Sequence, residues 1–414
     1  MGIGHLSRIL IVAAFYAVVV PVSAGARSWS SPADDAVTFR LNPAHTNNIN
    51  FTGGFSPNLK LAWSRFVPDP NWFLTPTIAN GMLFIVERVH QGTPGDVLHA
   101  LRLKDGHELW YKKFSTSIGD GFAAPAYDNG NVFVLDGNGV VHALSAAKGK
   151  KLWQTKLPKQ YFGWGNPVVR NGQVFVSSAG DLHYSSLVAI DEATGEIQWI
   201  GKINYGGFGT PALDSTGGVY IAPPCNYYRF NTETGNRDWY VKHGDCHGGG
   251  GLTPTYLNGI LFVQDVVSQN DLTHIYLFDA ATGKEKGSFL ANWGLSPAFY
   301  TDKSAIDRGV TLSGKNYETL TNWNVATKQA IWSYTPGNGD TFEAAPIVVN
   351  GMIFVSDGRH DIIVMDADTG AVLNTISPDV ECSSHECSLG LQLVAGDGAL
   401  AAGDYGELFV YTPN

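Results

Sequence analysis

The sequence predicts one large all-β domain, an eight-bladed β-propeller of four-stranded blades, and three observations lead to this prediction. The chain has 48 Gly and 20 Pro in 414 residues, so it contains many short turns. One layout of short strands and tight turns recurs seven times, and successive copies begin 42 to 49 residues apart. The apolar positions lack the 3.6-residue period that a solenoid of helices requires.

Each copy opens on a proline that follows a small or polar residue. The opening prolines are Pro76, Pro125, Pro167, Pro211, Pro254, Pro297 and Pro346. Five copies continue with an Asn-Gly pair, and both residue types tolerate the positive φ angles of a two-residue hairpin turn. These pairs begin at Asn80, Asn129, Asn171, Asn258 and Asn350. The strand that follows, such as MLFIV from Met82, is apolar on both faces, so we expect it to be buried between neighbouring blades.

A second turn lies near the end of each copy. It is clearest in AIDEATGEIQW, from Ala189 to Trp199, where Asp191 begins the turn, Gly195 takes the left-handed conformation and Trp199 packs outward. Related versions are RFNTETGNRDW ending at Trp239, LFDAATGKEKG from Leu277 to Gly287, and VMDADTGAVLN from Val364 to Asn374.

This pattern resembles the tryptophan-docking repeat of the pyrroloquinoline-quinone (PQQ) type, found in quinoprotein dehydrogenases and in the outer-membrane-barrel assembly lipoprotein. The chain is similar to the shorter, BamB-type members, and the resemblance covers nearly all of it. The resemblance implies that each tryptophan stacks against the next blade. The tryptophans expected in this role are Trp63, Trp110, Trp153, Trp199, Trp239 and Trp332. The segment FRLNPAHT, from Phe39 to Thr46, resembles the stretch that precedes the first blade in that family.

The two ends of the chain are expected to share the eighth blade. NLKLAWSRFV, around Trp63, has the pattern of an outer strand without inner strands before it, whereas residues Leu389 to Tyr411 supply three strands and then stop. The N-terminal strand should complete this blade and so remove the open sheet edges. Seven blades would result if the irregular copy from Pro297 to Trp332 did not form a blade.

The N-terminus is typical of a secretory signal, with Arg8, an apolar run from Ile9 to Val22 and small residues through Ala26. We therefore expect a signal peptide (1–26), a lead-in segment (27–57) and one propeller domain (58–414). Export to the periplasm or the extracellular space, with no stable membrane anchor after cleavage, follows from this division. The formal charge of −10 disfavours nucleic acid as a partner.

The four cysteines form an even set, which in an oxidising compartment favours two disulfides. Local pairing would join Cys225 to Cys246 and Cys382 to Cys387, and the two other connectivities remain open. The same regions contain histidines that are weak candidates for zinc or copper ligands. They are His243, His247 and His385. Because thiols in such a compartment more often pair with each other, no metal is predicted.

The loops before the opening prolines differ in length and composition, so we expect them to form the binding face of the propeller, the variable face. Many carry an aromatic residue shortly before the proline. The aromatic candidates at the channel mouth are Trp72, Phe122, Tyr161, Trp164, Tyr205, Phe208, Trp293 and Phe342. Such rings suit stacking against a sugar, another ring or an apolar peptide side chain, or they fill gaps between blades. The acidic candidates are Asp120, Asp245, Asp340 and Glu343.

Three functions fit these features, and whether the protein is an enzyme stays open. The first is a non-catalytic propeller that binds a protein partner or a small ligand on the variable face, as the resemblance to the shorter members implies. The second is a PQQ-dependent dehydrogenase with bound calcium, acting on an alcohol or a sugar. The resemblance implies an adjacent pair of cysteines in such enzymes, which this sequence lacks. The third is carbohydrate binding or processing. No cofactor is predicted.

Overall fold

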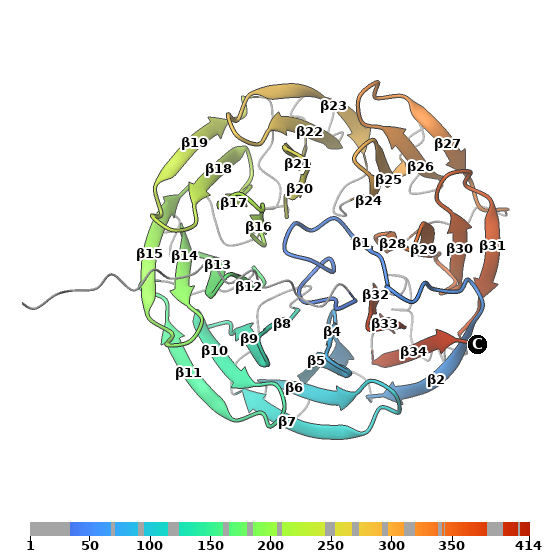
Figure 1. Cartoon of the computed structure of the whole chain (residues 1–414), viewed down its shortest axis with the longest axis horizontal. Coiled ribbons are helices and arrows are strands. Elements are labelled where there is room, and N and C mark those ends of the chain that lie inside the picture. Colours follow the sequence, from blue (N-terminus) through green and yellow to red (C-terminus); the bar gives the residue numbers. More distant parts are fainter. Residues whose placement is uncertain are drawn as a thin grey trace, which may run out of the picture.

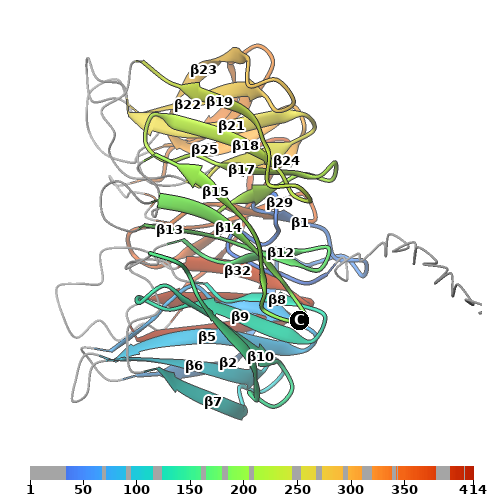
Figure 2. The same ribbon diagram turned by 90° about the vertical axis from the view of Figure 1, so that its left-hand side faces the viewer.

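The computed structural model describes residues 34–67, 71–89, 95–114, 124–159, 165–179, 185–204, 209–244, 253–266, 273–291, 297–309, 319–337, 342, 344–378, 392–404 and 406–414. They form eight small sheets set around one axis, so the fold is an all-β, eight-bladed propeller (Figure 1). The view from the side shows the strands of each blade running between the two faces of the ring (Figure 2). The predicted fold class and number of blades are confirmed.

The first four blades follow the chain from the axis outward. Blade 1 contains β4 (Thr77–Ala79), β5 (Met82–Val89), β6 (Gly95–Arg102) and β7 (Glu108–Phe114), with the short β3 (Trp72–Phe73) also paired to β5. Blade 2 contains β8 (Ala126–Asp128), β9 (Asn131–Leu135), β10 (Val140–Ser145) and β11 (Lys151–Lys156). Blade 3 contains β12 (Val168–Arg170), β13 (Gln173–Ala179), β14 (Ser185–Asp191) and β15 (Ile197–Ile203). Blade 4 contains β16 (Ala212–Leu213), β17 (Gly218–Ile221), β18 (Asn226–Asn231) and β19 (Arg237–Lys242).

The other four blades repeat this order, and the last is completed by the N-terminal strand. Blade 5 contains β20 (Thr255–Leu257), β21 (Ile260–Val266), β22 (Thr273–Asp279) and β23 (Glu285–Ala291). Blade 6 contains β24 (Ala298–Thr301), β25 (Ser304–Gly309), β26 (Thr319–Asn324) and β27 (Ala330–Tyr334). Blade 7 contains β28 (Ile347–Val349), β29 (Met352–Ser356), β30 (Ile362–Asp366) and β31 (Val372–Ile376), with β1 (Asn48–Ile49) parallel to β28. Blade 8 contains β32 (Gln392–Gly396), β33 (Ala399–Asp404), β34 (Glu407–Pro413) and β2 (Leu59–Phe66).

The closure of the ring is the one that the sequence predicts. Strand β2 pairs antiparallel with β34, from Leu59 opposite Pro413 to Phe66 opposite Glu407. The irregular copy forms blade 6, with its four strands in the usual order, which excludes the seven-bladed alternative. The predicted signal peptide, residues 1–26, lies outside the described residues. No helix in the described part of the chain is long and apolar enough to cross a membrane.

The Asn-Gly pairs adopt the backbone conformation that the sequence predicts. At Asn80 and Gly81 the φ angles are 52° and 68°, and the other four pairs are positive at both residues as well. Two consecutive left-handed residues characterise the type I′ hairpin turn, which matches the twist of the strands on either side. These turns and the Asp-x-x-Thr-Gly turns lie at one face of the ring, which we call the turn face.

Tryptophans of the outer strands link each blade to the next. The Trp153 Nε1 donates to Glu192 O of the following blade at 2.8 Å, and its ring lies against the turn glycine Gly195. The same arrangement recurs for Trp63, Trp110, Trp199, Trp239 and Trp332. Two blades lack the tryptophan. In blade 5 Gly287 takes its place and contacts the Lys328 side chain, and in blade 7 the Asn374 Nδ2 donates to Pro57 O.

Candidate ligand site on the propeller axis

Residues 34–51, which we call the plug, lie across the axis at the turn face and appear as the blue loop at the centre of Figure 1. Six backbone carbonyls of the plug accept a hydrogen bond from an inner strand, always from the amide two residues after the opening proline. The donor and acceptor pairs are Ile78 to Ala36, Tyr127 to Val37, Leu213 to Pro43, Tyr256 to Ala44, Phe299 to Thr46 and Val348 to Asn47. In blade 3 the direction is reversed, because Thr38 Oγ1 of the plug donates to Pro167 O. In blade 8 the backbone amide of Asp397 donates to Asp34 O of the plug. The plug therefore contacts all eight blades.

The plug follows this path only because several of its residues are left-handed. Arg40, Leu41, His45 and Asn47 have φ angles of 59°, 72°, 60° and 50°. Each left-handed non-glycine residue costs on the order of 1 kcal/mol or more, and it persists only where the surroundings hold it. The hydrogen bonds to the surrounding blades supply that constraint.

A row of three polar side chains, which we call the collar, lies next to the plug, just before the inner strands of blades 3, 4 and 5. It consists of Asn166, Thr210 and Thr253, each of which directly precedes an opening proline. Ala124 N donates to Asn166 Oδ1 at 2.7 Å, Asn166 N donates to Thr210 Oγ1 at 3.2 Å, and Thr210 N donates to Thr253 Oγ1 at 3.2 Å. Each of these side chains thus accepts a hydrogen bond from a backbone amide of the preceding blade. Buried amides need such partners, which explains the polar residue before the proline.

Two charged or titratable side chains of the plug reach this collar. Arg40 Nη1 donates to Thr253 O at 2.9 Å, and His45 Nδ1 lies 3.1 Å from Pro254 O. Burial lowers the pKa of Arg40 to about 9, so the guanidinium is still charged at neutral pH. Burial, and then the charge of Arg40, lower the pKa of His45 to about 3. His45 is therefore neutral, with its proton on Nδ1, and Nε2 has no hydrogen-bond partner among the described residues.

The chemistry of this arrangement favours an anion. A guanidinium with hydroxyl and amide groups around it recognises sulfonate, phosphate or carboxylate oxygens. A quinone bound with calcium needs carboxylate oxygens around the cation. The collar as described offers none, and no group of three His, Cys, Asp or Glu in the described ranges could hold a metal ion. The described residues of the collar and the plug therefore do not fit a quinone with its cation.

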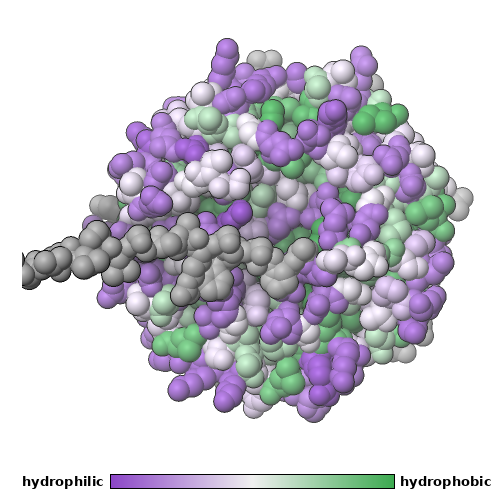
Figure 3. Space-filling model, in the orientation of Figure 1, coloured by the Kyte–Doolittle hydropathy of each residue, from purple (hydrophilic) through white to green (hydrophobic). Residues whose placement is uncertain are grey.

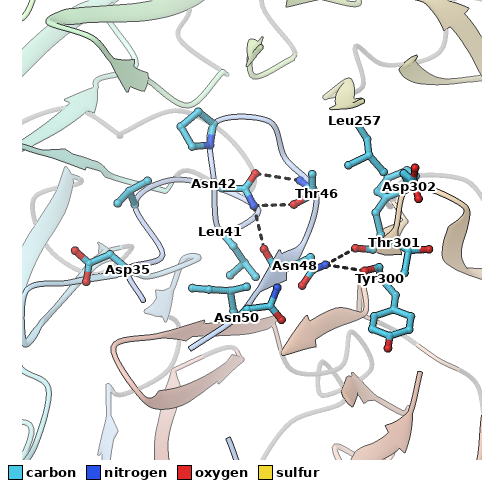
Figure 4. Close-up of a pocket in the computed structure, with 14 residues that line it drawn as sticks. Asp35, Leu41, Asn42, Thr46, Asn48, Asn50, Leu257, Tyr300, Thr301 and Asp302 are labelled. Carbon is cyan, nitrogen blue, oxygen red and sulfur yellow. Dashed lines mark hydrogen bonds between the residues drawn. The ribbon is translucent and has the colours of Figure 1, made fainter. Parts of the chain in front are cut away.

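A cavity lies beside the plug on the turn face, and none of the collar residues lines it. Its volume is about 460 Å³, and plug residues and the end of β24 form most of its wall (Figure 4). Asn42 Nδ2 donates to Thr46 Oγ1 and Asn48 O, and Asn48 Nδ2 donates to Phe299 O. Asp35 lines one end, and burial raises the pKa of its carboxyl group to about 6.

The structure describes two of the eight aromatic candidates. Trp72 is half-buried in β3, with the Arg88 guanidinium 6.0 Å from its ring centre. Phe342 is fully buried in the core between blades 6 and 7, the packing alternative that the sequence left open. The candidates outside the described residues are Phe122, Tyr161, Trp164, Tyr205, Phe208, Trp293, Asp120, Asp245, Asp340 and Glu343. None of these is placed at the axis or away from it.

Of the metal and disulfide candidates, His243 and Cys225 are described. The His243 ring packs 4.3 Å from the Tyr276 ring, and its Nε2 is 3.9 Å from Glu285 Oε2. Cys225 N donates to the buried Asp265 at 2.9 Å. The remaining candidates, Cys246, Cys382, Cys387, His247 and His385, lie outside the described residues. The predicted disulfide pairing therefore remains a prediction, to be checked by peptide mapping without reduction.

The collar and the plug were not found by reasoning from the sequence. The signals were present, since the small or polar residue before each opening proline and the segment FRLNPAHT both stood out. Nothing in their spacing, however, shows that Arg40 and His45 meet Thr253 and Pro254 more than 200 residues away. Only the closed ring brings them together.

Comparisons with known proteins agree with this fold. BamB from Moraxella catarrhalis superposes with a TM-score of 0.59 and 15% identity, covering 86% of this chain and 100% of that chain. A europium-containing methanol dehydrogenase superposes with a TM-score of 0.63 and 13% identity, covering 92% of this chain and 98% of that chain. The quinohemoprotein alcohol dehydrogenase of Comamonas testosteroni superposes with a TM-score of 0.62 and 13% identity, covering 92% of this chain and 80% of that chain. At these identities the likeness shows the fold alone.

One curated protein is similar in sequence. Tetrathionate hydrolase of Acidithiobacillus ferrooxidans is 25% identical over 250 residues, covering 45% of this chain and 48% of that protein. The matched region thus spans about half the length of this relative. The family model described as "Outer membrane protein assembly factor BamB" matches residues 94–239 and 271–414, more than half of the chain. The chain therefore belongs to the β-propeller family of the outer membrane protein assembly factor BamB.

Proposed function

We propose that this protein is an exported propeller that binds a small anion on its axis, at the collar next to the plug. The observation that carries the proposal is the position of Arg40, whose guanidinium lies against Thr253 O in surroundings that lower its pKa. Desolvation lowers the pKa of this guanidinium, and an anion bound beside it would favour its charged form. The hydroxyl and amide groups of the collar can orient the oxygens of such an anion.

The tetrathionate hydrolase relative supports a specific first ligand. Tetrathionate carries a sulfonate group at each end, and a guanidinium can bind two oxygens of such a group with paired hydrogen bonds. Hydrolysis of this dianion is the activity to assay first. If turnover is found, the acidic candidates Asp120, Asp245, Asp340 and Glu343 are the first residues to mutate, because a hydrolase needs a group that activates water.

The family match supports a second candidate, binding of a protein partner on the variable face. The loops that would form most of that face lie outside the described residues. The PQQ-dependent dehydrogenase stays the enzymatic alternative, because two of the similar solved structures are dehydrogenases. One binding experiment separates the anion-binding proposal from the dehydrogenase.

The experiment is calorimetric titration of the mature protein with tetrathionate, thiosulfate, and PQQ with and without calcium, followed by an assay for tetrathionate loss. We expect tetrathionate to bind and Arg40→Gln to weaken binding by about tenfold or more, with Arg40→Lys retaining part of it. The matched control is Arg237→Gln, which removes a guanidinium from the outer strand β19. Equal affinities in Arg40→Gln and the wild type would contradict the proposal, and tight binding of PQQ would favour the dehydrogenase.

A further inference from the structure

The charges of this protein are distributed unevenly. Three segments, residues 59–66, 102–114 and 146–159, together contain eleven Lys or Arg and two Asp or Glu, a formal charge of +9. Because the whole chain carries −10, the remainder carries −19. We call these three segments the basic rim. A local excess of this size creates a positive field on a protein that is acidic elsewhere.

The three segments are neighbours on the outer edge of the ring. They contain β2, β7 and β11, the outer strands of blades 8, 1 and 2, along the lower arc of Figure 1. Their contacts confirm this placement, because Trp63 of β2 packs on Gly106 before β7, and Trp110 of β7 packs on Gly149 before β11. The basic rim is therefore one continuous surface over three blades.

The two acidic side chains of the basic rim are already paired. Asp105 accepts from Arg102 at 2.8 Å, and Glu108 accepts from Arg65 at 2.9 Å. The lysines of the basic rim are all exposed: Lys60, Lys104, Lys112, Lys113, Lys148, Lys150, Lys151, Lys156 and Lys159. The positive charge that faces solvent therefore comes from the lysines.

Large apolar side chains stand among these lysines. Leu61 is 51% exposed, Phe66 64%, Leu109 41%, Tyr111 56% and Leu152 48%. The space-filling view shows polar and apolar side chains interspersed along the lower edge of the molecule (Figure 3). Other outer strands also expose apolar residues, such as Ile200 and Ile331 at 50% each, but without a comparable group of lysines.

We propose that the basic rim docks the propeller edge-on onto an anionic phospholipid surface. Lysines near such a surface are attracted to its headgroups, and leucine, phenylalanine and tyrosine side chains between them enter the interfacial layer. The anchors are spread over the convex edge of three blades, which suits a deformable lipid surface better than the central pocket that dominates most protein interfaces. The acidic remainder of the chain is repelled by the same surface, so only this edge faces it.

Vesicle binding tests the proposal independently of any ligand at the collar. The mature protein is mixed with vesicles of phosphatidylcholine alone and with vesicles that contain 30% phosphatidylglycerol, and the bound fraction is measured by sedimentation. We expect binding to the anionic vesicles only, and a loss of about tenfold or more in affinity when salt rises from 50 to 300 mM.

Two pairs of matched variants show whether the basic rim is the contact. Lys112→Glu/Lys150→Glu should weaken binding by about tenfold or more, whereas Lys202→Glu/Lys242→Glu, with the same charge change on exposed lysines of blades 3 and 4, should leave most of it intact. Leu109→Ser/Leu152→Ser should also weaken binding, and Ile200→Ser/Ile331→Ser should not. Thermal midpoints confirm that all four variants fold.

Three results would overturn the proposal. The first is that the wild-type protein does not bind anionic vesicles at low salt. The second is an equal loss in the rim variants and their matched controls, since this would place the attraction elsewhere. The third is binding to a soluble acidic polypeptide but not to anionic vesicles, which would assign the basic rim to an acidic protein instead of a lipid surface.

Discussion

At the scale of single residues, the docking tryptophans illustrate how one side chain serves two purposes. Trp153 covers the turn of the next blade with its ring, and its Nε1 donates a hydrogen bond to Glu192 O. The indole thereby buries a large apolar area and satisfies its own donor, which is the usual requirement for a buried tryptophan. The sequence predicted which tryptophans do this, and the partner glycines follow from the repeat.

Replacing one of these tryptophans should therefore weaken the ring. For Trp153→Ala we expect a loss of about 3 kcal/mol in the free energy of unfolding, because the ring leaves a gap between blades 2 and 3. Denaturant unfolding measures it. The control is Leu152→Ala on the same strand, at a side chain that is 48% exposed, where the loss should be small. Similar losses in the two variants would contradict the assigned role.

Asp35 of the plug makes the free energy of unfolding depend on pH. The pKa of Asp35 is raised to about 6, chiefly by burial, while its Oδ1 accepts from Asn80 N. The folded state thus binds this proton more tightly than the unfolded state, so the residue lowers stability as pH rises from about 4 through about 6.

Asp35→Asn removes this penalty and keeps an acceptor for Asn80 N. We expect the variant to be more stable than the wild type by roughly 2 to 3 kcal/mol at pH 8, and nearly equal to it at pH 4. Unfolding curves at both pH values measure the difference. A variant that is less stable than the wild type at pH 8 would show that the ionised Asp35 carboxylate stabilises the folded state.

At the scale of elements, the two turns of a blade use glycine for different reasons. Gly172 and Gly195 have φ angles of 77° and 78° in blade 3. A Cβ at Gly172 would meet open space, whereas a Cβ at Gly195 would lie 2.7 Å from the Trp153 ring. The first turn needs glycine for its backbone alone, and the second needs it for the backbone and for the docking of the neighbouring blade.

This difference is measurable with one substitution at each turn. Gly172→Ala should cost about 1 kcal/mol, the penalty of a left-handed alanine. Gly195→Ala should cost at least about 2 kcal/mol more, because the Trp153 ring must move as well. Denaturant unfolding measures the loss in free energy of unfolding for both variants, and a shift of the tryptophan fluorescence spectrum reports the displaced ring. Equal costs would mean that the ring adapts freely.

Elements differ in how well the sequence predicted them. The Asn-Gly turns and the apolar strands after them were predicted because both depend on local backbone preferences and burial. The short strands β1 and β3 were not predicted, since each has two residues and exists only through its partner. Blade 6 was the doubtful element. It forms because its strands find the same neighbours as every other blade, although Lys328 replaces the turn glycine with a φ of 61°.

At the scale of the whole molecule, the two chain ends hold the ring closed. The plug forms hydrogen bonds with every blade, and β2 pairs with β34 inside blade 8, so the N-terminal segment ties the last blade to the rest of the ring. Without β2, the outer edge of β34 would present unpaired backbone groups, which favour association between molecules.

A truncation series tests this closure. Removing residues 1–66, which include the plug and β2, should give a protein with a markedly lower thermal midpoint that forms dimers or larger species. Removing residues 1–33, which precede the plug, should leave a stable monomer. Light scattering after size-exclusion chromatography measures the mass of both. A stable monomer from the longer deletion would show that three strands suffice for blade 8.

The sequence by itself determined the architecture of this protein, because repeat spacing, turn chemistry and docking tryptophans each act within one blade or between adjacent blades. The candidate site was decided by the tertiary structure alone. Arg40, His45 and the collar residues Asn166, Thr210 and Thr253 come from the plug and from three separate blades, and they meet only when the ring closes. Contacts across an axis depend on the position of every blade, and no local pattern in a chain encodes them.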